Sequence, residues 1–455
     1  MRRKSRYLRR FAGRIGSFLL CVALGAGIAK REANCVSQPS RLLQLIEYTS
    51  KKAAETMQLS GAMKRLLLMN AASTIIFNYI GIFVNLFIWE KNNKISEVVW
   101  FNLVLFVMWT LAFGVGSRLL TSFTTRALIR SNAICGGLVF LLLSTLELDN
   151  RLLWIAIIAM PIGIMWGFYA SAQNITLSVF GKGRDFEQYF SMSNIINQVI
   201  SIVNPIAFAL IIKWIGYSGS FLLMFLFVAL LMAVSFFIPT ITLAGSTEKL
   251  FQGVRFRLVF STSALRWMVP SLLAAGVFLQ FQMLFALVFT FSVSEDKLII
   301  ALFNVLYASS AIGAMMLYRR LHVKEGLWLK IGMTFLAVGI LLPLLPKAPI
   351  LILSNLFTTI GMFYFGTVWN TRQFRIISKQ PAMQQARIFL WREGFLNVSR
   401  IALLVVALSV QDLHGGTFYL LIALALVCAF IVPVFSGKST EMFERQGEAG
   451  SAESR

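Results

Sequence analysis

Long apolar segments alternate with short polar segments from about residue 66 to residue 436. Each apolar segment has close to the roughly 20 residues that a helix needs to cross the hydrocarbon core of a bilayer. Helices are expected because an open sheet edge cannot be hydrogen-bonded in lipid, and the segments are too continuously apolar for barrel strands. The pattern predicts an all-α integral membrane protein of about twelve spans, at approximately 66–89, 98–116, 128–147, 152–179, 191–212, 217–238, 267–292, 298–318, 328–345, 349–370, 388–410 and 416–436.

Basic residues are distributed unevenly over the loops between these segments. With the N-terminus in the cytoplasm, the cytoplasmic loops carry 18 Lys and Arg residues and the opposite loops carry 6. Short cytoplasmic loops of membrane proteins are enriched in Lys and Arg, so this distribution predicts cytoplasmic N- and C-termini and an even number of spans. We therefore expect a multi-pass protein of the cytoplasmic membrane. The tenth loop in this count contains Arg372, Arg375, Lys379, Arg387 and Arg392.

The longest loop inside the apolar region separates two sets of six predicted helices. This loop covers residues 240–266, and the two sets cover residues 66–239 and 267–436. Short sequence matches relate the sets at offsets of 197–199 residues, and each match falls at the same place in the two sets. An internal repeat of this length predicts a duplicated six-helix unit. The matches are Ile162-Gly163 with Ile360-Gly361, Phe190–Val199 with Phe389–Val398, and Gly219–Phe221 with Gly416–Phe418.

The two ends of the chain differ from the apolar region. Residues 1–65 are rich in Lys and Arg, and we expect a cytoplasmic extension that lies against the inner leaflet. A cleaved signal segment, or a start site near Met57 or Met63, is the alternative for this part. Residues 437–455 are small, polar and charged, which predicts a disordered cytoplasmic tail.

Composition excludes a water-soluble fold, because 58% of the residues are hydrophobic and only 13% are charged, against about a quarter in soluble domains. The net charge of +23 lies in short runs between apolar segments, so we expect membrane lipids as partners and no nucleic acid. The scattered cysteines and two histidines predict no metal, cofactor or disulfide framework. The sequence also lacks the phosphate-binding loop of ATPases and the common hydrolase motifs, so we expect no enzyme. The cysteines are Cys21, Cys35, Cys135 and Cys428, and the histidines are His322 and His414.

Three local motifs accompany this architecture. They are Gly216–Phe221 at the start of the sixth predicted helix, Asn204-Pro205 in the fifth, and Gly114–Arg118 after the second. With these motifs, residues 66–436 resemble the major facilitator superfamily of transporters, without assignment to a subfamily. The resemblance implies two pseudo-symmetric six-helix bundles that give a small solute alternating access to a central site. It also implies gating loops that contain Gly116, Arg118, Arg319 and Arg320, although the aspartate usual in this motif is missing.

Amide and aromatic side chains occur in the first, fourth, seventh and tenth predicted helices. In the transporters that this chain resembles, these helices line the central cavity. Such side chains suit a neutral or amphipathic ligand, and the alternative for each is a hydrogen bond between helices. The candidates are Asn78, Tyr79, Asn85, Tyr169, Gln173, Asn174, Gln280, Gln282, Tyr364, Trp369 and Asn370.

Charged side chains inside a predicted span are rare because lipid penalises them. Glu393, Asn397 and Arg400 lie on one face of the eleventh predicted helix. They are either a polar strip that senses an anionic substrate or a proton, or a structural feature. In the structural interpretation, backbone carbonyls or an amide of the fifth helix hold Arg400, and Glu393 pairs with Arg392 or Arg387.

These features together predict a secondary active or facilitative transporter that moves a small organic solute and acts as a monomer. Two alternatives stay open. One is a transport-inactive sensor or scaffold, and the other is a membrane enzyme that acts on lipid-linked substrates. The sequence does not indicate the substrate, the direction of transport or a coupling ion.

The predicted topology can be tested by cysteine labelling in a background without native cysteines. Asp149→Cys should react with a membrane-impermeant maleimide on intact cells, because its loop belongs to the acidic, cation-poor set. Arg255→Cys should react only after permeabilisation. The reverse pattern would invert the topology.

Overall fold

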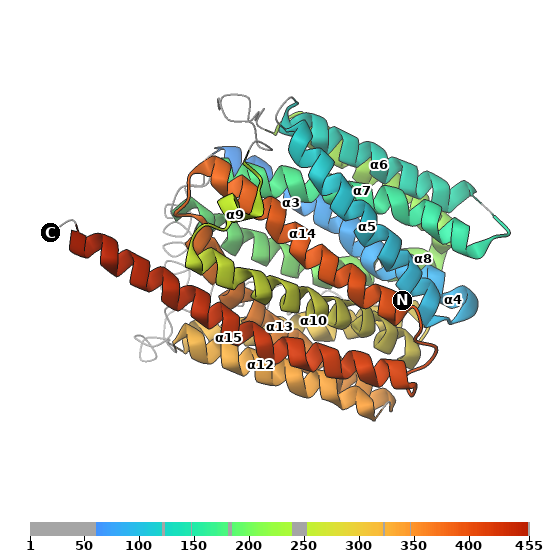
Figure 1. The fold of residues 1–455 in the computed structure, drawn as a ribbon. Coiled ribbons are helices and arrows are strands. Elements are labelled where there is room, and N and C mark those ends of the chain that lie inside the picture. Colours follow the sequence, from blue (N-terminus) through green and yellow to red (C-terminus); the bar gives the residue numbers. More distant parts are fainter. Residues whose placement is uncertain are drawn as a thin grey trace, which may run out of the picture.

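The structure is a computed structural model that describes residues 61–120, 123–146, 148–180, 184–238, 253–321, 324–345 and 347–453. Within these ranges every regular element is a helix. The helices form two bundles that lie side by side (Figure 1), one from α3 to α8 and one from α10 to α15. Residues 1–60 of the expected basic extension, and residues 240–252 of the expected central loop, lie outside the described residues.

The first bundle follows the first six predicted segments. Helix α3 (Gly61–Tyr79) continues through the π-helical turn η1 (Ile80–Val84) into α4 (Asn85–Asn92), which ends where Asn93 adopts a left-handed conformation. Helices α5 (Ile95–Leu119), α6 (Thr125–Thr145), α7 (Arg151–Phe180) and α8 (Arg184–Ser235) complete the bundle. Helix α8 contains the fifth and sixth predicted segments, which meet at Gly216 with φ of 72°. A glycine adopts this angle without the steric penalty of a side chain.

The second bundle consists of α10 (Ser263–Val293), α11 (Lys297–Arg320), α12 (Glu325–Leu341) with the 3₁₀ turn η3 (Leu342–Leu344), α13 (Ala348–Ile377), α14 (Ala382–Ala407) and α15 (Gly416–Glu453). The short helix α9 (Phe256–Val259) precedes it. At the start of α11, the Asp296 carboxylate accepts hydrogen bonds from the backbone N–H groups of Ile299 (3.1 Å) and Leu298 (2.7 Å). These bonds lower the pKa of Asp296, because they stabilise the charged form.

Helix α15 corrects the prediction of a disordered tail, because it continues through residue 437 to Glu453. The Ser439 hydroxyl donates to the backbone carbonyl of Ala264 at 2.6 Å, and Met442 and Phe443 pack against the apolar core. Lys438, Glu441, Glu444, Arg445 and Gln446 therefore lie on the exposed face of a helix that docks on α10. In Figure 1 the end of α15 projects beyond the second bundle.

Helix α14 also differs from the prediction, because it begins at Ala382 and not near residue 388. Pro381 is its N-cap residue. Arg387 and Arg392 therefore lie inside the helix, whereas the charge count had placed them in a cytoplasmic loop. The side chain of Arg392 is only 12% exposed.

Ten helical stretches in the described part of the chain are long and apolar enough to cross a membrane. Helix α14 is not among them, since Arg392, Glu393 and Arg400 interrupt its apolar sequence. The stretch Ile196–Ser235 counts once although Gly216 divides it. The protein is thus a multi-pass membrane protein, and the number of twelve spans stays a prediction.

Equivalent helices pack against each other in the two bundles. Helix α7 contacts α5 and α6, as α13 contacts α11 and α12. Helix α6 contacts α8 as α12 contacts α15, and α3 contacts α8 as α10 contacts α14 and α15. Between the bundles, α5 contacts α14 and α8 contacts α11. These two contacts are equivalent, because α5 corresponds to α11 and the first part of α8 corresponds to α14. This agreement confirms the predicted pair of pseudo-symmetric helical bundles.

Three glycines allow α5 and α7 to approach closely. A Cβ atom at Gly167 would lie 2.6 Å from the Trp109 carbonyl oxygen and 2.7 Å from the Ala112 Cβ, and one at Gly163 would overlap the Leu105 carbonyl oxygen. Gly116 packs against Ser171 in the same interface. It therefore lies inside α5, and we had expected it in a gating loop.

The other residues of the expected gating loops lie at helix ends. Arg118 is exposed in the last turn of α5. Arg319 and Arg320 are the last residues of α11, where Arg320 is exposed and the side chain of Arg319 is outside the described set. A role in gating stays a prediction for these three arginines.

The α5–α7 interface can be tested with matched alanine substitutions. Gly167→Ala should lower stability by about 1–3 kcal/mol, because the new methyl group overlaps backbone atoms of α5. Gly114→Ala is the control in the same region, since a Cβ atom there meets nothing within 4 Å. Thermal unfolding in detergent measures both. Equal midpoints for the two variants would contradict the close approach of α5 and α7.

Candidate functional site

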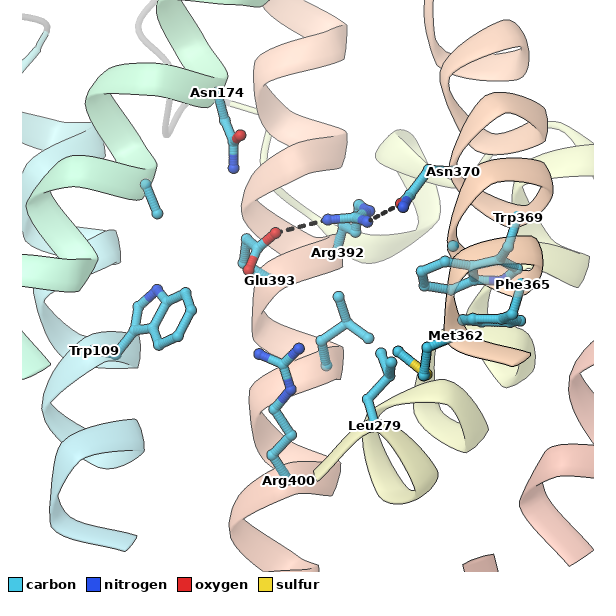
Figure 2. A pocket seen from close by; sticks show the side chains of 13 residues that line it. Trp109, Asn174, Leu279, Met362, Phe365, Trp369, Asn370, Arg392, Glu393 and Arg400 are labelled. Atoms are coloured by element: carbon cyan, nitrogen blue, oxygen red, sulfur yellow. Dashed lines mark hydrogen bonds and ion pairs between the residues drawn. The ribbon is translucent and has the colours of Figure 1, made fainter. Parts of the chain in front are cut away.

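A cavity of about 280 Å³ lies between the two bundles. The first bundle contributes α5 and α7, and the second contributes α10, α13 and α14. Figure 2 shows the lining side chains around α14, with Trp109 on one side and the α13 residues on the other. The lining residues are Trp109, Ala170, Asn174, Leu279, Met362, Phe365, Gly366, Trp369, Asn370, Arg392, Glu393, Leu396 and Arg400.

Several partners hold Arg392 in place. Its Nη1 lies 2.7 Å from the Glu393 Oε1, its Nη2 donates to the Asn370 Oδ1 at 3.1 Å, and its Nε donates to the Gln373 Oε1 at 2.8 Å. The guanidinium also lies 5.6 Å from the centroid of the Trp369 ring. Two of these bonds are the dashed lines in Figure 2. Arg392 and Glu393 therefore form an ion pair that α13 fixes in the cavity wall.

Arg400 has a different environment. Its Nη1 donates to the Asn397 Oδ1 at 3.2 Å, and its guanidinium lies over the rings of Phe106 (5.2 Å) and Trp109 (5.8 Å). Within the described part of the chain, no carboxylate lies within the 4.0 Å of an ion pair to Arg400. Among the described side chains, no amide of the fifth helix bonds to Arg400. Since Phe106 and Trp109 belong to α5, Arg400 contacts the other bundle through cation–π interactions.

Aromatic side chains form the walls next to these charges. Trp109 stacks on Phe106 with 5.2 Å between ring centroids and meets the edge of Trp166 at 5.2 Å. On the opposite side, Trp369 stacks on Phe365 at 5.1 Å and donates through its Nε1 to the Ser271 hydroxyl at 3.0 Å. The cavity thus combines charged groups with large apolar surfaces.

A hydrogen-bond network in the first bundle uses two of the expected cavity residues. Tyr169 and Gln173 both donate to the Asn70 Oδ1, at 2.8 and 3.4 Å, and the Asn70 Nδ2 donates to Ser193 and Asn197, at 3.1 and 3.0 Å. Both donors and both acceptor positions of Asn70 are therefore used. Tyr169 and Gln173 join α3, α7 and α8 and are not among the residues that line the cavity described above.

Three expected cavity residues of the first helical segment also bond to neighbouring helices or to their own helix. The Asn78 Oδ1 accepts from Asn204 at 3.0 Å, and the buried Tyr79 hydroxyl bonds to that of Ser220 at 2.6 Å. Asn85 donates to the backbone carbonyl of Gly81 at 3.0 Å and accepts from Asn102 at 3.3 Å. These contacts match the alternative of interhelical hydrogen bonds.

The expected candidates of the second bundle divide between the cavity and the core. Tyr364 is buried against Trp328 with 4.7 Å between ring centroids. Gln280 is fully buried, and neither of its polar atoms has a hydrogen-bond partner among the described residues; Gln282 is half-buried outside the cavity. Trp369 and Asn370 line the cavity, as does Asn174 of α7. Of the charged strip, Glu393 and Arg400 line it, and Asn397 supports Arg400 from behind.

Trp109, Met362, Phe365 and Leu396 could not be predicted from the sequence, because apolar side chains in lipid-spanning helices carry no signal that separates a cavity wall from a lipid-facing surface. Arg392 was not predicted as a lining residue either. The signal that could have located Arg392 is Pro381, since proline is common at helix starts and this one places Arg392 three turns into α14.

Polar and aromatic contacts join the bundles at the end that carries Asn93, which we call the Asn93 end. Lys297 forms an ion pair with Glu90 at 2.8 Å and lies 5.1 Å from the centroid of the Tyr217 ring. Asn93 donates to the Glu295 carboxylate at 2.9 Å. In each contact one partner belongs to the first bundle and the other to the second.

The cavity lies in the middle of the protein and toward the opposite end. Asn370 is seven residues before the end of α13 and Asn174 is six before the end of α7, which places both about 10 Å from the helix ends away from Asn93. Trp109 and Arg400 lie deeper. The contacts of the Asn93 end therefore separate the cavity from that side of the protein.

Comparisons with known proteins identify the fold class. Neither a family model nor a curated protein matches the chain. Among solved structures, the chain is similar to a POT family transporter in complex with 5-aminolevulinic acid, with 13% identity, a TM-score of 0.62, and 83% of this chain and 96% of that chain covered. A bacterial homologue of the iron transporter ferroportin in an outward-facing state is 13% identical with a TM-score of 0.56, and the match covers 84% of this chain and 98% of that chain.

At this identity the likeness shows the fold alone. The chain has the major facilitator fold, and the similar proteins of that fold are transporters and not enzymes. The fold agrees with the resemblance that the sequence motifs indicated.

The ion pair in the cavity wall can be tested with a double-mutant cycle. Arg392→Gln and Glu393→Gln should each destabilise the protein, and the double variant should be more stable than the sum predicts by about 1–3 kcal/mol, because each single change leaves one buried charge without its partner.

Thermal unfolding in lipid nanodiscs measures this coupling. The matched control is the exposed Arg445–Glu441 pair of α15, at 67% and 54% exposure, whose coupling should be about 0–1 kcal/mol. Additive effects at Arg392 and Glu393 would show that the two side chains do not depend on each other.

Proposed function

We propose that this protein is a secondary transporter that carries a small organic solute across the cytoplasmic membrane by alternating access. The observation that carries the proposal is a cavity lined from both bundles and separated from one end of the protein by contacts between those bundles. Two bundles that rock about a midplane site expose it to each side in turn. The transporters of similar fold support the same interpretation.

With the predicted orientation in the membrane, the structure corresponds to an inward-facing state of the transporter. With cytoplasmic termini, the Asn93 end is the outer end, so the outer side is closed and the cavity lies toward the cytoplasm. In the outward-facing state of this proposal, the Glu90–Lys297 and Asn93–Glu295 contacts separate. The α5–α14 and α8–α11 interfaces are the surfaces on which the bundles turn. The protein acts as a single chain, with membrane lipids around it.

The cavity favours transport over the two alternatives. A scaffold has no need for three charged side chains in the interior of a membrane protein, where they are costly. An enzyme that acts on lipid-linked substrates needs a nucleophile or paired acids, and the described cavity wall contains one carboxylate and neither His nor Cys.

Cross-linking the Asn93 end tests alternating access. The protein carries Asn93→Cys and Glu295→Cys, replaces the four native cysteines, and is treated with a short, cleavable bifunctional thiol reagent in proteoliposomes. Flux of a panel of radiolabelled organic acids, amines and neutral solutes should fall to background, because the outer side can no longer open, and cleavage should restore it.

The single variants treated with the same reagent are the controls and should keep their flux. Spin labels on the two cysteines should report a second, longer distance in the uncross-linked protein, since the outward-facing state separates residues 93 and 295. A single short distance together with no flux for the whole panel would favour the scaffold.

A further inference from the structure

The charges in the cavity wall do not balance. Arg392 and Glu393 form a neutral pair, which leaves the Arg400 cation. An arginine side chain stays protonated in proteins, so proton loss cannot remove this charge. The described cavity wall therefore carries one net positive charge in the interior of a membrane protein.

The hydrogen-bond donors of Arg392 are occupied by described residues, whereas most of those of Arg400 are not. The Nε, Nη1 and Nη2 atoms of Arg392 all have acceptors, in Gln373, Glu393 and Asn370. Among the described side chains, Arg400 has one acceptor, Asn397. A guanidinium has five N–H groups, so most donors of Arg400 are available to a ligand.

Aromatic rings and one amide surround the guanidinium of Arg400. Phe106 and Trp109 lie against the guanidinium at 5.2 and 5.8 Å, and Asn397 holds its Nη1. Figure 2 shows the guanidinium of Arg400 on the same side of α14 as Glu393, toward Trp109. Aromatic rings stabilise a guanidinium but do not neutralise it, and a charge in a membrane interior normally has a counter-ion. A ligand with one negative charge would provide that counter-ion.

The rest of the wall defines the non-ionic part of such a ligand. Leu279, Met362, Phe365 and Leu396 provide apolar surface, and Trp369 provides a ring. A volume of about 280 Å³ is close to the lower end of the roughly 300–1,000 Å³ of small-molecule sites. A small organic ligand fits this space.

We propose that the cavity binds a small amphipathic organic monoanion, with its carboxylate on Arg400 and its apolar or aromatic group against Phe365, Leu279 and Leu396. This inference rests on the proposed function, since it takes the cavity as the substrate site. Carboxylate and guanidinium match in geometry and form two parallel hydrogen bonds. Glu393 disfavours a second negative charge by repulsion, because it lies on the same face of α14.

A series of ligands that differ mainly in charge tests the proposal on the unmodified protein. Benzoate and phenylacetate are compared with neutral benzamide, cationic benzylamine, zwitterionic phenylalanine and dianionic phthalate, by isothermal titration and by the shift in Tm of the protein in nanodiscs. Benzoate and phenylacetate should bind at least tenfold more tightly than every other member. Equal or tighter binding of benzamide, benzylamine, phenylalanine or phthalate would overturn the proposal.

Variants of Arg400 locate the carboxylate. Arg400→Gln should weaken phenylacetate binding at least tenfold, and Arg400→Lys should retain part of the affinity, because lysine keeps the charge but not the paired donors. Arg445→Gln is the control that removes the same charge from an exposed position on α15. Without ligand, the Tm of Arg400→Gln should equal or exceed that of the unmodified protein, since the variant removes an uncompensated charge.

Unchanged phenylacetate affinity in Arg400→Gln would overturn the proposal, and if this variant does not fold, the ligand series decides alone. The two proposals fail in different ways. If flux depends on opening of the Asn93 end but the protein shows no preference for monoanions, the transporter proposal would be supported and this substrate class excluded. If the protein binds monoanions but shows a single distance between residues 93 and 295, the ligand class would be supported and the transporter excluded.

Discussion

Lipid cannot replace water as a partner for backbone groups, amides or charges, and this constraint shapes the whole protein. The backbone satisfies it by forming helices. The amide side chains satisfy much of it by bonding between helices, as Asn70 does with four partners and Asn355 does with Ala286, Thr290 and Tyr307. Charged groups have fewer solutions: buried Glu97 pairs with Arg151, and Arg392, Glu393 and Arg400 lie together on the wall of one cavity.

The two bundles share a packing plan but differ in chemistry. In the first bundle, a polar network around Asn70 uses the amides of α3, α7 and α8, and of its described residues Trp109, Ala170 and Asn174 reach the cavity. In the second bundle, α13 and α14 provide most of the wall and all of its charges. The first bundle therefore serves mainly as a packed aromatic and polar support, against which Arg400 lies. The second bundle provides the groups that can select a ligand by charge.

The sequence was sufficient for the fold and insufficient for the cavity, for a physical reason. Segment length, loop charge and the internal repeat depend on the bilayer, which acts on every residue in the same way. Which way a side chain points depends on a rotation of about 100° per residue and on the neighbouring helix. Asn174 therefore reaches the cavity whereas Gln173 bonds to Asn70, and no local pattern distinguishes the two.

Errors at helix ends have a related origin. The tail after residue 436 and the start of α14 both have loop-like composition, rich in Gln, Ser, Glu or Arg. Each becomes helical because one face finds apolar or polar partners on another helix, as Ser439 does on α10. Such tertiary contacts override composition, and they decided whether Arg392 belonged to a loop or to the cavity.

The internal repeat bears on the meaning of Arg400. In the register that aligns Phe190 with Phe389, the counterparts of Arg392, Glu393 and Arg400 are Ser193, Asn194 and Ser201. The first bundle reaches the same helix packing with these uncharged residues, so the fold does not require the charges. A buried charge seldom adds stability relative to an uncharged alternative. Because the fold does not require the charge of Arg400 and the described cavity wall holds two arginines but one carboxylate, the presence of Arg400 is best explained by a ligand that carries the missing negative charge.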